Sequence, residues 1–234
     1  MERMKLWYLH NLLIRKATPE TNMEHIVEKI RSMEEYCCDC YDEKIDLSSA
    51  KFVEMLVVDG FFIIELFRKM IGDMPRGVDD PLFNRSGMLS IVQNDLLLLE
   101  NQLPWRVLDC LFHQVPGGKC KSLWELTQRI LPSWRGLEYF VSHVPNTLQS
   151  RHLLDTLRIL SVEFESDKNE KVCPFRVRIP SATELLQVGV KFRRKRGFDS
   201  ILNITLLDGV MEIAPITLDA EKSVFRNLIA LGRV

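Results

Sequence analysis

Two short motifs carry side chains that could bind a metal ion. Cys37 and Cys40 form a Cys-x-x-Cys motif, and Cys110 and His113 form a Cys-x-x-His motif. Thiolates and imidazoles are the usual ligands of structural zinc, so the four side chains together could hold one ion. Neither motif has the glycine-rich turn that such sites favour, and a redox role for the first would need a strand-to-helix context. We therefore expect no metal ion and no other cofactor.

Four carboxylates could perform acid–base chemistry if the fold brings them together. Asp59 and Glu65 lie on one apolar stretch, at a spacing that puts them on different faces of a straight helix. Asp95 and Glu100 lie on a second stretch, and a hydrolase-type site would require the four groups to converge in one cleft. The simpler interpretation pairs Glu65 with Arg68, one turn further along the same helix.

A polar cluster follows four consecutive leucines, Leu96 to Leu99, which we expect to be helical and mostly buried. Its members are Glu100, Asn101 and Gln102, and they could line a pocket with Asp59 and Glu65. We favour a second interpretation, in which they cap helix ends at a tight corner and satisfy backbone groups. No residue is assigned a catalytic role. The residues of possible functional weight are Asp59, Glu65, Asp95, Glu100, Asn101 and Gln102.

The basic run from Lys191 to Arg196 could bind phosphate groups, anionic lipid or a nuclear import receptor. We favour a solvated loop ahead of a hairpin, with the interrupting Phe192 marking a chain that enters a core. A membrane-surface protein that uses this run remains an alternative.

Composition excludes several classes of protein. The chain has 46% hydrophobic residues and nearly balanced charge, with 31 Lys and Arg against 32 Asp and Glu, so it lacks the field that attracts nucleic acid. The stretch from Phe52 to Ile71 carries too many charges for a membrane span. No phosphate loop, dinucleotide fingerprint or Gly-x-Ser-x-Gly elbow is present. We lean against an enzyme and expect a cytoplasmic chain.

Hydrophobic periodicity predicts a mainly α (α+β) fold, in which 1–234 forms one domain. Residues 1–160 should form a helical body, and residues 175–234 should form a helix, a β-hairpin and a terminal helix packed on it. Ser48 or Ser49, Ser181 with Glu184, and Asp208-Gly209 are the clearest capping and turn signals. The helices are expected at about 1–16, 20–41, 50–71, 87–100, 104–114, 121–130, 134–141, 150–160, 181–188 and 220–231, the exposed connection at 161–172, and the strands at 201–207 and 210–216.

Four stretches resemble the plant domain of unknown function 247 family, in the order that the family shows. They are Phe52 to Leu66, similar to its Asp-Gly helix; Asp95 to Pro104, similar to its leucine-rich signature; His152-Leu153-Leu154-Asp155; and Ile179 to Leu185 with Gly189 to Phe192 and Asn227 to Ala230.

This resemblance implies a plant protein without established enzymatic chemistry. Relatives are usually longer and carry a C-terminal membrane anchor, and some are linked to self-incompatibility, which implies recognition of an unknown protein partner. Relative to that pattern, we expect this chain to be truncated at both ends. The truncation predicts an exposed apolar patch at Phe61, Phe62 and Phe67, and with it possible self-association.

The first prediction concerns metal content. Purified protein should carry no stoichiometric zinc, because the cysteine and histidine motifs lack the turns that position zinc ligands. Elemental analysis checks this. A content of about one zinc per chain, lost when Cys37 and Cys40 are changed to Ser, would overturn the expectation.

Overall fold

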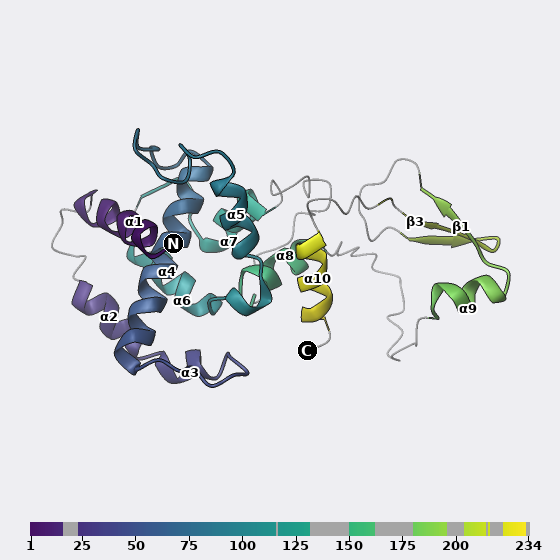
Figure 1. Ribbon diagram of the computed structural model, residues 1–234, viewed down its shortest axis with the longest axis horizontal. Helices are drawn as coiled ribbons and strands as arrows, with labels where there is room; N and C mark the ends of the chain where they lie inside the picture. The colour runs from purple at the N-terminus through teal and green to yellow at the C-terminus, as the bar shows by residue number, and fades with distance from the viewer. Residues whose placement is uncertain are drawn as a thin grey trace.

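The computed structural model describes residues 1–15, 23–115, 117–131, 150–161, 180–195, 204–213, 215 and 222–232. Helices dominate this part of the chain, and its strands all follow residue 190 (Figure 1). The fold is mainly α with a small β element near the C-terminus, as the sequence predicts.

The centre of the helical body is α4 (Ser49–Met70), which is apolar on nearly every side. The hydroxyl of Ser48 accepts a hydrogen bond from the Lys51 amide and caps this helix, which confirms one of the two predicted caps. A helix that is apolar all round must be surrounded by other elements. Among the described helices, those in most extensive contact with it are α1 (Glu2–Arg15), α2 (Met23–Arg31), α6 (Trp105–Gln114) and α7 (Leu123–Ile130).

The single helix expected over 20–41 is divided in the described residues. α2 ends at Arg31, and a short α3 (Glu34–Cys38) follows after a turn at Ser32 and Met33. The Ser32 hydroxyl donates to the Lys29 carbonyl, which is the local competition with helical bonding that serine offers.

The leucine run is not α-helical, which corrects the expectation. α5 (Met88–Asp95) ends before it, and a short 3-10 helix, η1 (Leu99–Asn101), closes the segment. Leu96 and Leu97 are buried, whereas the next two leucines are only half-buried. The helix stops because the Gln102 side chain donates to the carbonyls of Leu96 and Leu98, which a continuing helix would use itself.

The last part of the helical body contains α8 (Leu153–Ser161), which contacts α7. The C-terminal helix α10 (Lys222–Leu231) contacts α8 and η1, and Figure 1 draws it beside α8. The helix expected over 134–141 and nearly all of the connection expected over 161–172 lie outside the described residues.

The β element begins with α9 (Ala182–Gln187), whose start shows the predicted capping box between Ser181 and Glu184. Strands β2 (Thr205–Leu207) and β3 (Val210–Ile213) pair antiparallel, which confirms the hairpin. Asp208 and Gly209 at its turn have φ values of 49° and 71°, the positive pair that such tight turns require.

The basic run is a strand rather than a loop over its first four residues, which is a correction. β1 (Lys191–Arg194) pairs parallel with β3, so the sheet order is β1-β3-β2. Its partner lies far along the chain, so no local signal announces the pairing. Phe192 does not enter a core, because its side chain is 37% exposed.

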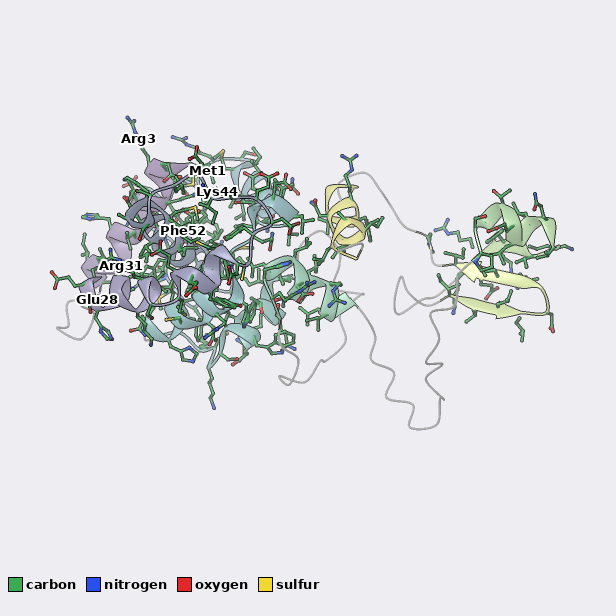
Figure 2. All side chains as sticks on the ribbon, turned by 90° about the horizontal axis from the view of Figure 1, so that it is seen from below. Met1, Arg3, Glu28, Arg31, Lys44 and Phe52 are labelled. Atoms are coloured by element: carbon green, nitrogen blue, oxygen red, sulfur yellow. The ribbon has the colours of Figure 1, made fainter. Side chains whose placement is uncertain are left out.

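The described part of the β element contains no buried residue. Its side chains stand around the strands, in contrast to the crowded interior of the helical body (Figure 2). The packing of the sheet on the body therefore stays a prediction.

The expected apolar patch at Phe61, Phe62 and Phe67 is absent, because these side chains are 1%, 2% and 0% exposed. α1 packs against this side of α4, and the Tyr8 ring meets the Phe62 ring edge-on with centroids 5.1 Å apart. The N-terminal helix thus supplies the cover that the sequence reasoning assigned to a missing segment.

The second prediction concerns the crossing of α4 and α6 at Gly60. A Cβ at this position would collide with the side chain of Leu111, so Gly60→Ala should lower the free energy of unfolding by about 1–3 kcal/mol. In a Leu111→Ala background the same change should become neutral or stabilising by up to about 1 kcal/mol, because alanine favours the helix. Chemical denaturation of the four proteins measures both effects. Equal costs in the two backgrounds would show that Gly60 does not set the crossing.

Candidate functional site

Asp59 is engaged by the N-terminal helix. The Lys5 ammonium lies 2.7 Å from its carboxylate, and both side chains are mostly buried. Burial raises the pKa of Asp59, although the hydrogen bond and charge of Lys5 act in the opposite direction. This carboxylate therefore belongs to the contact between α1 and α4.

Glu65 pairs with Arg15 of α1, and the expected intrahelical pair with Arg68 is wrong. The Arg15 guanidinium donates to both carboxylate oxygens of the fully buried Glu65, at 2.7 and 2.8 Å. A planar, bidentate pair of this kind is the strongest form of charge-assisted hydrogen bond. Arg68 instead lies over the Phe112 ring, 4.9 Å from its centroid, and burial lowers its pKa.

A third polar contact along α4 was missed by the sequence reasoning. Lys69 and Asp80 form an ion pair of 2.8 Å with side chains 4% and 0% exposed. The Tyr8 hydroxyl and the Leu82 amide donate to the same carboxylate, at 3.0 and 3.1 Å. The Lys69 ammonium also lies 4.1 Å from the centroid of the Tyr8 ring. The residues of this polar contact, Tyr8, Lys69 and Asp80, come from α1, α4 and the loop after α4, so no sequence spacing could have identified them.

The polar signature after the leucines forms a hydrogen-bonded junction. The Gln102 side chain donates to the carbonyls of Leu96 and Leu98 and accepts from the Leu154 amide, so it joins this turn to the start of α8. Asn101 donates to the Asp95 carbonyl, whereas Glu100 is exposed. Gln102 and Asn101 thus fulfil the structural interpretation favoured from the sequence.

The His-Leu-Leu-Asp stretch caps α8. The Asp155 amide donates to Nδ1 of His152, and the Asp155 carboxylate accepts from the Arg151 amide. Burial opposes ionisation of Asp155, but this bond and those from Arg158 outweigh it and hold its pKa below the usual value. The Ser150 hydroxyl bonds Thr156 and the His152 carbonyl rather than the imidazole, so these residues do not form a nucleophilic triad.

Two of the four candidate carboxylates converge. Asp59 and Asp95 line a small pocket of about 100 Å³, together with Lys5 and Asn101. Its apolar walls come from Met1, Phe62, Ile63, Val92, Leu96 and Leu103. Glu65 faces Arg15 instead, and Glu100 does not line the pocket. The pocket therefore holds a paired carboxylate and a second one, and its lining contains no serine, threonine, cysteine or histidine.

The two cysteine motifs lie on different elements. Cys37 is buried in α3 and Cys40 lies in the turn after that helix, whereas Cys110 is half-buried in α6. Burial raises the pKa of the Cys37 thiol to about 12, so it is neutral at physiological pH. Within the described residues, no group of three or more His, Cys, Asp or Glu side chains could hold a metal ion.

The third prediction tests the structural role of the signature. Gln102→Glu keeps the size of the side chain but turns an oxygen toward the two leucine carbonyls, so the free energy of unfolding should fall by about 3 kcal/mol or more. Its matched control is the neighbouring exposed Glu100→Gln, which should change stability by less than about 0.5 kcal/mol. Urea denaturation measures both, and similar small effects would contradict the junction.

Within the described ranges, no helix is both long and apolar enough to cross a bilayer. No solved structure matches the chain significantly.

Two Arabidopsis thaliana proteins are similar in sequence. The UPF0481 protein At3g47200 is 30% identical in an alignment of 243 residues, gaps included, that covers 92% of this chain and 49% of that protein. The putative UPF0481 protein At3g02645 is 32% identical over 142 residues, covering 53% of this chain and 25% of its own length. This chain thus spans about half the length of the first relative and a quarter of the second. Residues 1–233 match the family described as plant protein of unknown function, DUF247, and the chain belongs to that family.

Proposed function

We propose that this chain is a non-catalytic protein-interaction module, in which the helical body is a scaffold and the β element carries the binding surface. The observation that supports this most is the use of the signature side chains. Glu65 and Gln102 are committed to contacts inside the body, and Asp59 is held by Lys5. Groups engaged in this way are fixed and charge-compensated, which suits a rigid scaffold better than proton transfer.

The β element supplies the second argument. The strand register places Phe192, Met211 and Leu206 in one row across the sheet, and Ile213 lies on the same face. We call these four residues the apolar face of the sheet. Leu206 is 57% exposed and the other three are exposed or half-buried. A sheet this small gains little stability unless its apolar face is covered, which favours a surface that orders on binding.

The hydrolase alternative has one supporting observation, the shared pocket of Asp59 and Asp95. It has less support than recognition, because Glu65 and Glu100 lie elsewhere and Lys5 already neutralises Asp59. Asp95→Asn, which removes the Asp95 carboxylate, distinguishes the hydrolase alternative from the interaction function, because a scaffold should keep its partner after this change.

The fourth prediction tests the binding surface by cross-linking and capture from plant tissue. Leu206→Ser should abolish capture of proteins held by the wild-type chain, because it breaks the apolar row without disturbing the body. The matched control is Ile91→Ser on α5, since the two side chains are 57% and 53% exposed. This control should retain the same proteins, and both variants should unfold within about 0.5 kcal/mol of wild type. If the two variants capture the same proteins as wild type, the apolar face is not the binding surface.

A further inference from the structure

β1 is an edge strand whose outer side faces no other described strand. It pairs with β3 on one side, and the sheet order β1-β3-β2 leaves its other side open among the described strands. An open edge presents unpaired backbone donors and acceptors, which makes it a template for an added strand.

The unpaired groups of this edge can be assigned. The amides of Lys191 and Lys195 donate to the carbonyls of Gly209 and Ile213, so they point toward β3. Because the bonds of a parallel ladder recur at every second residue, the amides of Phe192 and Arg194 point away from β3. The outer edge therefore offers two backbone donors, flanked by the carbonyls of the same residues.

The side chains of β1 select the charge of an added strand. Lys191 and Arg193 lie on the face opposite Phe192, and all three side chains are exposed. Arg193 forms an ion pair of 2.8 Å with Glu212 across the sheet. No acidic partner of Lys191 occurs among the described residues. Like charges opposite one another destabilise a strand pair, so two copies of β1 should not pair with each other. Opposite charges stabilise the pair, and an acidic strand therefore fits this edge.

The two faces of β1 also define a pattern within that strand. Next to Phe192, the added strand would extend the row formed with Met211 and Leu206, which requires an apolar side chain. Next to Lys191 and Arg193 it would place acidic side chains. Because alternate residues of a strand point to opposite faces, the complementary sequence alternates apolar and acidic residues.

We propose that β1 binds an extended protein segment of alternating apolar and acidic residues, which adds to the sheet as a fourth strand. This inference rests on the proposed interaction function and names the chemical class of the partner. The added strand would satisfy the outward amides, neutralise Lys191 and extend the apolar face, so one ligand meets all three features of the edge.

The fifth prediction uses a fluorescent peptide of alternating valine and glutamate, added to the full chain and followed by anisotropy. The glutamate peptide should bind more weakly in high salt, and its lysine counterpart should not bind. Lys191→Glu should weaken binding about tenfold or more, since the change puts a carboxylate beside the acidic side chains of the peptide. Arg31→Glu, at an exposed residue of the helical body, is the matched control and should leave the affinity unchanged.

A second variant tests the backbone contact independently of charge. Phe192→Pro removes one outward amide while leaving the β1–β3 ladder intact, as an edge strand tolerates, and it should also abolish binding. Far-UV circular dichroism and the unfolding midpoint should match wild type for every variant. Absence of glutamate-peptide binding, or equal binding of the lysine peptide, overturns the proposal.

Other occupants of the edge give different results. One such result is a chain that fails to bind the peptide and instead binds phosphatidylserine vesicles, but not phosphatidylcholine vesicles, through Lys191 and Arg194. In that case the edge recognises a membrane surface and the proposal fails. Light scattering that shows a dimer lost in Phe192→Pro would assign the edge to a second copy and also overturn it. If the peptide fails while capture from tissue still requires Leu206, the interaction function stands and only the assignment to β1 is lost.

Discussion

The burial of charged residues on α4 is the constraint on which the helical body depends. Glu65 and Lys69 are almost completely buried, where an unpaired charge costs several kcal/mol. Their partners, Arg15 and Asp80, come from α1 and from the loop after α4. Neither partner can move far without leaving a buried charge unpaired. The charges therefore fix where α1 and this loop lie against a helix whose apolar surface alone would permit several arrangements.

A second set of contacts extends this order to the rest of the body. Gln102 closes the turn after α5 and holds the first turn of α8, and the Tyr41 hydroxyl donates to the carbonyl of Gln102. The backbone of Trp105 donates to the Arg151 carbonyl at 2.7 Å, so α6 and α8 begin at one shared junction. Because the Gln102 bonds to Leu96 and Leu154 are buried, each group left unsatisfied there would carry a large penalty, and the junction has few alternatives.

The elements that could be predicted from the sequence are those with local signals. The Ser48 cap, the capping box at Ser181 and the Asp208-Gly209 turn depend on residues within a few positions of one another. The missed features depend on distant residues. Glu65 pairs across 50 positions rather than with nearby Arg68, and Tyr8 reaches Asp80 across 72. For the same reason the parallel strand β1 was predicted to be a loop, and the contact of Gln102 with Leu154, 52 positions away, could not be read from the sequence.

The contrast between the body and the β element underlies our proposal that a rigid scaffold carries a surface completed by its partner. Hydrogen–deuterium exchange of the isolated chain tests this claim most directly. Amides of α4 between Leu56 and Phe67 should exchange slowest, because opening them exposes buried apolar and charged groups. Amides of β1 to β3 should exchange far faster, since the described part of this element has no buried residue. Strand amides protected as strongly as those of α4 would contradict the account, because the sheet would then already be covered within the isolated chain.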